Sequence, residues 1–192
     1  MSESSRPQST ALLELALGGA RSGKSCYAEQ RALASGLECI YIATAHAGDG
    51  EMAERIRQHQ EQRSGFSKTI EEPLQLAAVI AEQMSASRCL LIDCLTLWLT
   101  NLLLLDNEAR FAQEKSALFD VLKNYRGHIV FVSNEVGQGI VPLDPLSRRF
   151  VDESGRLHQQ LATICNRVAF VVAGLPQILK DEFETVDREK NR

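Results

Sequence analysis

The sequence predicts an α/β fold in which helices flank a mostly parallel sheet. Short apolar runs alternate with longer amphipathic segments along the chain, an order typical of βαβ units. The chain has 192 residues, a length that suits one compact domain. Its apolar fraction of 44% and charged fraction of 24% are those of an ordinary globular protein, so disordered and collagen-like classes are excluded.

Five apolar runs are expected to form strands, because each is bounded by turn residues or by a change of period. They are residues 12–18, 39–45, 89–95, 128–135 and 167–174, with a short extra strand expected within 65–73. Helices are expected at 24–35, 51–63, 73–86, 96–105, 109–125 and 145–166, the third opening at Pro73.

The two ends of the chain are expected to lie outside the domain. Residues 1–10 lack the apolar core and cleavage pattern of a signal peptide, and a flexible leader is expected there. Residues 181–192 are charged and carry no apolar stripe, so a frayed tail is expected. A single domain is therefore expected over residues 11–180.

Charge and cysteine usage restrict the partners and the compartment. A formal net charge of −4 gives no basis for nucleic-acid binding. The apolar stretch 89–105 contains Asp93, two threonines and Asn101, so no stable membrane insertion is expected. The five cysteines are odd in number and form no CxxC pair, which is typical of reduced thiols in a cytoplasmic protein.

The segment "GGARSGKS", residues 18–25, matches the pattern G-x-x-x-x-G-K-[ST] between a predicted strand and a predicted helix. In such a loop the backbone amides form an anion nest, Lys24 reaches the β and γ phosphates, and the Ser25 hydroxyl ligates magnesium. The segment predicts a P-loop NTPase-like (RecA-like) fold that binds a nucleoside triphosphate. A glycine-rich turn with an exposed lysine is the alternative.

An acidic residue after a second buried strand is the expected companion of such a loop. Asp93 follows four apolar residues, and we expect it at the edge of the sheet, where it would hold Mg²⁺ or a water of its shell together with Ser25. Asp93 is also a candidate N-cap of the next helix, and the two roles can coexist.

The predicted helix 51–63 carries Met52, Ile56, His59 and Arg63 at spacings of four, three and four, so they share one face. His59 is either a structural residue on an apolar face or a nucleophile or base, with Arg63 stabilising phosphate charge. Periodicity does not separate these interpretations.

The segment "SNEVGQGIVP", residues 133–142, leaves a predicted strand with Asn134 and Glu135 and two glycines. A polar loop at the carboxyl end of a parallel strand belongs to the binding edge of the sheet. The alternative is that the glycines only serve a tight turn.

Taken together, six segments in this order resemble the bifunctional adenosylcobinamide kinase / adenosylcobinamide-phosphate guanylyltransferase family of cobalamin biosynthesis. They are "GGARSGKS", "YIATA", "EMAERIRQHQEQR", "TIEEP", "TNLL" and "SNEVGQGIVP". The resemblance runs from about Leu13 to about Leu179. It implies a P-loop fold and a homo-oligomer, typically a trimer.

The resemblance also implies the reactions and substrates. A nucleoside triphosphate, ATP or GTP, phosphorylates the aminopropanol hydroxyl of adenosylcobinamide. GMP is then transferred from GTP to adenosylcobinamide phosphate through a guanylyl-histidine, with release of pyrophosphate. Only small-molecule substrates are implied as ligands, with Mg²⁺ as the metal.

The residues implied by the resemblance fall in three groups. The catalytic residues are His59, which carries GMP, and Lys24; His46 lies in a glycine-rich loop where the family does not place its nucleophile. The phosphate-binding residues are Gly18, Gly19, Ala20, Arg21, Ser22, Gly23, Lys24 and Ser25. The guanosine contacts are expected at Ile42, Ala43, Thr44, Gln60, Glu61, Gln62, Arg63, Glu71 and Asp93.

Two other functions compete with this interpretation. An ordinary P-loop small-molecule kinase would turn over ATP without a protein-bound nucleotide. A nucleotide-dependent switch would hydrolyse GTP slowly, and adenosylcobinamide would not accelerate it.

Overall fold

The computed structural model describes residues 11–45 and 65–182. Within these residues the sheet has seven strands in the order β3-β2-β4-β5-β1-β6-β7. All neighbouring strands pair in parallel except β7, which runs antiparallel to β6. The strands are β1 (Leu12–Gly18), β2 (Glu38–Ala43), β3 (Lys68–Glu71), β4 (Arg88–Asp93), β5 (His128–Asn134), β6 (Arg167–Val172) and β7 (Leu175–Asp181).

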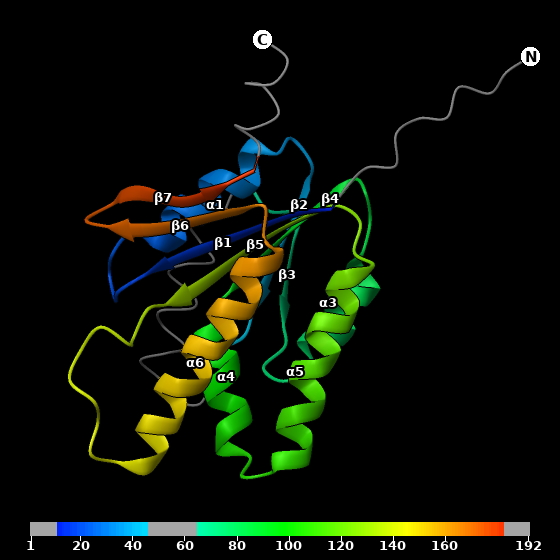
Figure 1. The fold of residues 1–192 in the computed structure, drawn as a ribbon. Helices are drawn as coiled ribbons and strands as arrows, with labels where there is room; N and C mark the ends of the chain where they lie inside the picture. Colours follow the sequence, from blue (N-terminus) through cyan, green and yellow to red (C-terminus); the bar gives the residue numbers. More distant parts are fainter. Residues whose placement is uncertain (1–10, 46–64, 183–192) are drawn as a thin grey trace, which may run out of the picture.

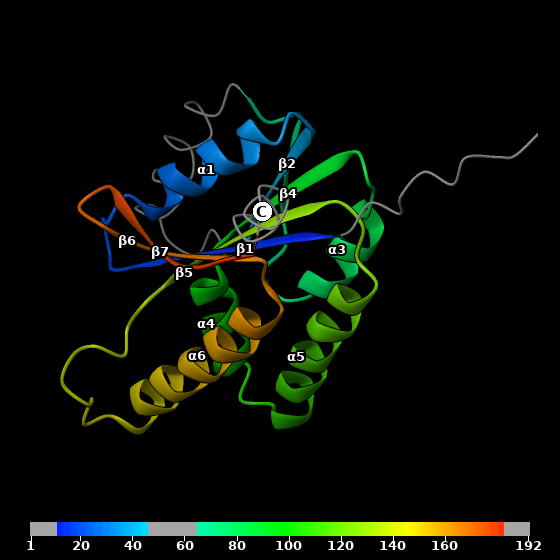
Figure 2. The same cartoon turned by 45° about the horizontal axis from the view of Figure 1, so that its top comes forward.

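Helices cover both faces of this sheet. One face carries α1, and the other carries the remaining described helices (Figures 1 and 2). The described helices are α1 (Lys24–Ala34), α3 (Leu76–Gln83), α4 (Leu95–Leu104), α5 (Glu108–Lys123) and α6 (Pro145–Ile164). None of them is long and apolar enough to cross a membrane. The predicted α/β fold with a mostly parallel sheet is confirmed.

The central strands are continuous apolar runs because the sheet is buried on both faces. Leu90, Leu91 and Ile92 of β4 are all fully buried, although they alternate between the two faces. The core under α1 is rich in small residues such as Ala28 and Ala32, whereas Trp98 belongs to the larger core on the opposite face. Small side chains let α1 approach the sheet closely.

The strand β7 was not predicted. It is the edge strand beside β6, and its large side chains are mostly exposed, so its sequence lacks the buried apolar run that identified the others. The turn that leads into it depends on Ala173 and Gly174, which both have positive φ. The tail predicted from residue 181 begins inside this strand, because Asp181 is its last residue and pairs with Arg167.

Two further elements were expected between β2 and β4, and the structure confirms the first and moves the start of the second. The extra strand expected within 65–73 is β3. The helix expected to open at Pro73 begins at Leu76, because the Glu72 carboxylate accepts hydrogen bonds from the backbone N–H groups of Leu74 and Gln75, at 2.8 and 2.7 Å, and forms a turn. The helix expected at 51–63 and the leader at 1–10 lie outside the described residues.

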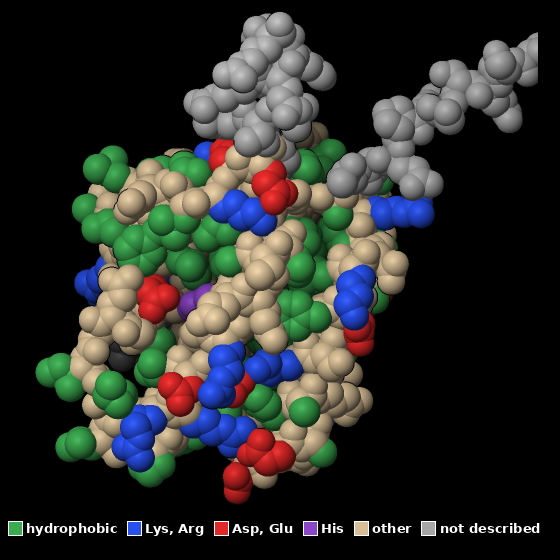
Figure 3. Space-filling model, in the orientation of Figure 1, with side chains coloured by type: hydrophobic (Ala, Val, Ile, Leu, Met, Phe, Trp, Pro, Cys, Tyr) green, Lys and Arg blue, Asp and Glu red, His purple; other side chains and the backbone are tan. Residues whose placement is uncertain are grey.

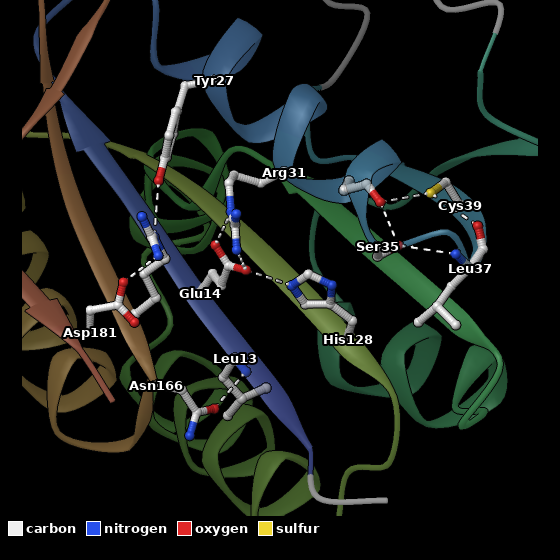
Figure 4. A network of polar contacts seen from close by, with 12 residues as sticks. Leu13, Glu14, Tyr27, Arg31, Ser35, Leu37, Cys39, His128, Asn166 and Asp181 are labelled. Carbon is white, nitrogen blue, oxygen red and sulfur yellow. Dashed lines mark hydrogen bonds and ion pairs between the residues drawn. The ribbon is translucent and has the colours of Figure 1, made fainter. Parts of the chain in front are cut away.

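A buried ionic cluster joins α1 to the sheet (Figure 4). Arg31, in the last turn of α1, donates to both carboxylate oxygens of Glu14 on β1, at 2.8 and 2.7 Å. His128 Nε2 lies 3.0 Å from Glu14 Oε1. Burial raises the pKa of Glu14, but the hydrogen bonds from His128 and Arg31 and the Arg31 charge outweigh it, and that pKa lies at about 2. The cluster fixes the orientation of α1, whose first residue is Lys24.

Candidate functional site

The first glycine of the predicted phosphate loop ends β1. Gly18 pairs with Asn134 of β5 on one side and with Val171 of β6 on the other. A Cβ at Gly18 would lie 2.6 Å from the Val171 carbonyl oxygen and 2.4 Å from Ser22 Oγ. Only glycine therefore lets the chain turn back over the end of its own strand.

The second glycine, Gly23, precedes α1 and has φ of 92°, in the left-handed region that favours glycine. A Cβ there would lie 2.9 Å from Gly174 Cα. Gly174 also donates its backbone N–H to the Ser22 carbonyl at 2.7 Å, so the turn between β6 and β7 supports the loop. The strand that was not predicted thus helps to shape the site.

Lys24 is the first residue of α1 and is only 8% exposed. Its Nζ donates to the Gly19 carbonyl at 3.1 Å, which lays the side chain across the loop. Burial lowers the pKa of Lys24, whereas the neighbouring Cys94 and Asp93 raise it. A glycine-rich turn with an exposed lysine is excluded, and a buried ammonium beside a glycine-rich turn at the start of a helix favours an anion.

The carboxyl ends of the parallel strands bring three predicted residues into one row. Ala43 of β2 pairs with Glu71 of β3 on one side and with Asp93 of β4 on the other. Asp93 is half-buried, and β5 separates its strand from β1. It does not cap α4, because Cys94 occupies that position and no side chain accepts a capping bond. The capping alternative is therefore wrong.

Three of the predicted guanosine contacts have buried side chains. Ile42 and Thr44 are fully buried, and Ala43 is 6% exposed. The Thr44 hydroxyl donates to the Cys94 carbonyl at 2.6 Å and accepts from the Cys94 N–H at 2.9 Å. These residues join the end of β2 to the end of β4 at the carboxyl edge of the sheet.

Part of the predicted site lies outside the described residues. This part comprises His59, Gln60, Glu61, Gln62 and Arg63, and also His46. The guanylyl acceptor and the contacts expected from that helix therefore stay predictions.

A buried polar cluster that was not predicted from the sequence lies beside the phosphate loop and is formed by Thr96, Ser133 and His158. The His158 Nε2 lies 2.7 Å from Ser133 Oγ, which lies 3.3 Å from Thr96 Oγ1. His158 Nδ1 faces Glu135 Oε2 at 3.5 Å. The signal in the sequence was weak, because His158 lies between Leu157 and Leu161 on the apolar side of a long helix.

Glu135 connects this cluster to the phosphate loop. Its backbone N–H donates to the Gly18 carbonyl at 3.1 Å, and its Oε1 accepts the Gly137 N–H at 2.6 Å. Burial lowers the pKa of His158 and favours its neutral form, although the Glu135 carboxylate opposes that shift. Gly137 and Gly139 have no positive φ, so a demand for left-handed backbone does not explain them.

An apolar groove with a volume of about 430 Å³ lies next to Glu135. The groove is lined by Val136 and Pro142 from the loop between β5 and α6, by Leu104 from α4, and by Leu146 and Phe150 from α6. The adjoining loop residues Ile140, Val141 and Leu143 are largely exposed. Hydrophobic side chains stand out from the same side of the molecule, over the segment between β5 and α6 (Figure 3). The groove offers an apolar surface beside a charged site.

The strand order, the glycine-rich turn at the end of β1 and the buried Lys24 define a P-loop nucleotide-binding protein. Residues 14–179 match the family model described as cobinamide kinase / cobinamide phosphate guanyltransferase. The chain belongs to this family.

Curated relatives agree with that match over nearly their whole length. The chain is 57% identical to the bifunctional adenosylcobalamin biosynthesis protein CobP of Pseudomonas aeruginosa, over 88% of this chain and 98% of the relative. It is 35% identical to the bifunctional adenosylcobalamin biosynthesis protein CobU of Escherichia coli and 34% identical to that of Salmonella typhimurium, each over 85% of this chain and 97% of the relative.

Proposed function

We propose that this chain phosphorylates adenosylcobinamide with ATP or GTP and then transfers GMP from GTP to adenosylcobinamide phosphate, in cobalamin biosynthesis. Membership of the cobinamide kinase / cobinamide phosphate guanyltransferase family supports both reactions. The observation that carries the proposal is the buried Lys24 ammonium held across the loop by Gly19, because such a cation neutralises phosphate charge.

Magnesium fits the oxygen donors of this site. The Ser25 hydroxyl follows Lys24 at the start of α1, and Asp93 lies at the carboxyl end of β4. Mg²⁺ prefers hard oxygen ligands and takes most of them from water and phosphates, so one or two protein groups suffice. When bound with the nucleotide, it would neutralise charge that develops on the phosphate oxygens.

The guanylyl transfer is proposed to pass through His59. A neutral imidazole attacks the α-phosphorus of GTP, and Lys24 with the loop amides stabilises the departing pyrophosphate. The phosphate of adenosylcobinamide phosphate then displaces the imidazole. Two in-line displacements give net retention of configuration at phosphorus. The expected contacts at Gln60, Glu61, Gln62, Arg63, Glu71 and Asp93 belong to this step.

The corrinoid is proposed to bind in the apolar groove between the loop that follows β5 and the helices α4 and α6. The groove begins at Val136, next to Glu135, whose backbone bonds the phosphate loop. A large, partly apolar substrate needs an open surface that adjoins the triphosphate site, and this groove meets both conditions.

The proposed assembly is a homo-oligomer, a trimer as the family resemblance implies, in the cytoplasm. Exposed apolar side chains on the edge strand β7, Leu175, Ile178 and Leu179, support self-association. Light scattering coupled to size-exclusion chromatography measures the mass of the assembly directly. A strictly monomeric mass at working concentration would contradict the proposed homo-oligomer.

One experiment tests the proposed function. The protein is incubated with Mg²⁺ and GTP, with and without adenosylcobinamide, and both the intact protein and the corrinoid products are analysed by mass spectrometry. We expect a GMP adduct on the protein without the corrinoid, and adenosylcobinamide-GDP with it. An ordinary kinase would yield phosphorylated corrinoid and no adduct, whereas a switch protein would yield neither.

A further inference from the structure

A continuous chain of polar groups runs through the otherwise apolar interior between α4, β5 and α6. It begins at the backbone N–H of Asn134, which donates to Thr96 Oγ1 at 2.7 Å. It continues through Ser133 to His158, whose Nδ1 has no hydrogen-bond partner among the described residues and faces the Glu135 carboxylate at 3.5 Å. Thr96, Ser133 and His158 are all less than a tenth exposed. Buried polar groups are costly unless they are paired, so such a chain needs a reason.

The direction of these hydrogen bonds is decided at the Glu135 end, because an ionised carboxylate can only accept. An N–H can only donate, so Thr96 Oγ1 accepts there and its own proton is free to point at Ser133 Oγ. Ser133 then donates to His158 Nε2, and the imidazole proton resides on Nδ1, facing Glu135. The opposite direction would set the Nδ1 lone pair against a carboxylate and is disfavoured. The chain therefore orients an N–H group toward Glu135.

Several described carboxylates lie at the carboxyl ends of the parallel strands. Among them, Glu135 follows the strand that lies next to β1, which leads into the phosphate loop. Its strand β5 pairs directly with β1, whereas Asp93 lies on β4 and Glu71 on the outermost strand β3. Its backbone is bonded to Gly18, the first residue of the loop. Its side chain is 22% exposed, so the carboxylate is accessible while the Gly137 N–H holds one oxygen and His158 Nδ1 faces the other at 3.5 Å. It also adjoins the apolar groove proposed for the corrinoid.

We propose that Glu135 is the catalytic base of the phosphoryl transfer and that His158 is its positioning residue. This inference rests on the proposed function. As the substrate hydroxyl oxygen forms its bond to the γ-phosphorus, the bond from that phosphorus to the β–γ bridging oxygen breaks. The electron pair of that bond leaves on the nucleoside diphosphate. The hydroxyl proton passes to the Glu135 carboxylate and from there to solvent.

The two reactions of the enzyme should respond differently to the loss of Glu135. In guanylyl transfer the acceptor is a phosphate oxygen, which has no proton to lose when it attacks. A base for a hydroxyl is needed in the kinase step alone. Loss of Glu135 should therefore separate the two activities, whereas general damage to the loop or the fold lowers both.

The experiment compares the Glu135→Gln, His158→Ala and His158→Asn variants, with Asp144→Asn as the matched control. Asp144 lies at the other end of the loop that leaves β5 and caps α6 with its carboxylate. Kinase turnover is measured with adenosylcobinamide. Guanylyl transfer is measured separately with preformed adenosylcobinamide phosphate, and thermal melting reports folding.

For Glu135→Gln we expect kinase kcat to fall by about 100-fold or more, with the KM for nucleotide and the guanylyl transfer within about twofold of wild type. For His158→Ala we expect a kinase loss of about tenfold to hundredfold from misplacement of the base. His158→Asn, whose amide can still donate toward Glu135, should recover part of that loss, and Asp144→Asn should match wild type.

Four results would count against the inference. A Glu135→Gln kinase within twofold of wild type would overturn it, and so would an equal loss of both activities in a variant that melts normally. A His158→Asn variant no better than His158→Ala would remove His158 from the positioning role. A wild-type protein without phosphorylation, but with guanylyl transfer, would overturn the proposed kinase function and this inference with it.

Discussion

The backbone N–H of Glu135 donates to the carbonyl of Gly18 at 3.1 Å, which joins the loop after β5 to the first residue of the phosphate loop. The two residues are far apart in sequence and meet because β5 pairs with β1. This contact ties the position of the loop after β5 to the position of the phosphate loop.

Replacing Lys24 with alanine should impair both reactions, since the same ammonium neutralises the triphosphate in each. We expect each kcat/KM to fall by about 100-fold or more. Isothermal titration with GTP and separate assays of the two reactions measure the effect. Lys123→Ala removes an exposed lysine at the end of α5 and should match wild type. Phosphorylation at full rate in Lys24→Ala would contradict the role of the P-loop.

Replacing His59 with alanine should abolish the GMP adduct and guanylyl transfer while phosphorylation continues, because the kinase step needs no covalent intermediate. Labelled GTP, followed by peptide mapping of the adduct, tests this assignment. His46→Ala is the matched control and should retain the adduct. An adduct mapped to His46, or none in the wild type, would show the assignment to be wrong.

Replacing Gly23 with alanine should destabilise the fold and weaken nucleotide binding. The new Cβ would lie 2.9 Å from Gly174 Cα, and the backbone holds φ of 92°. We expect a loss of about 1–3 kcal/mol in the free energy of unfolding, measured by urea denaturation. Gly155→Ala in α6, where a Cβ has open space, should not destabilise the protein. Equal stability of the two variants would contradict the close packing at Gly23.

The Glu14 cluster should make folding sensitive to acid. The pKa of Glu14 is about 2 in the folded protein, below its ordinary 4.5, so its contribution is present above pH 4.5 and is lost as the pH falls toward 2. At pH 7 we expect Glu14→Gln to lower the free energy of unfolding by about 3 kcal/mol, and the difference should shrink between pH 4.5 and 2.

Urea denaturation at several pH values measures this dependence. The control is Glu38→Gln, which breaks the exposed pair with Arg88 and should have a much smaller effect. A Glu14→Gln difference that stays constant from pH 7 down to pH 2 would show that the carboxylate charge contributes nothing.

The apolar groove can be tested at Leu104, which lines it and is 66% exposed, so a polar residue there does not disturb the core. Leu104→Ser should raise the KM for adenosylcobinamide by about 5-fold to 20-fold, the value of one buried aliphatic contact, and leave the KM for GTP unchanged. Leu33→Ser, on α1 and also exposed, serves as the control. An unchanged KM for the corrinoid would show that the corrinoid does not bind in this groove.

Much of the fold could be predicted because buried parallel strands are continuous apolar runs. The five runs predicted as strands correspond to β1, β2, β4, β5 and β6, and the loop motif lies between β1 and α1, where a phosphate loop requires it. β7 escaped prediction because an exposed edge strand needs no apolar run. Pro176 within it is tolerated because strand edges leave backbone groups unpaired.

By itself, the sequence determined the class of fold, the phosphate loop and the family, because these depend on local patterns that neighbouring residues carry. Only the tertiary structure decided that Lys24 is buried, that Asp93 does not cap α4, and that Glu135 bonds Gly18. The cluster of Thr96, Ser133 and His158 belongs to the same group. Its members come from α4, β5 and α6, and only the order of strands in the sheet brings such distant residues into hydrogen-bonding distance.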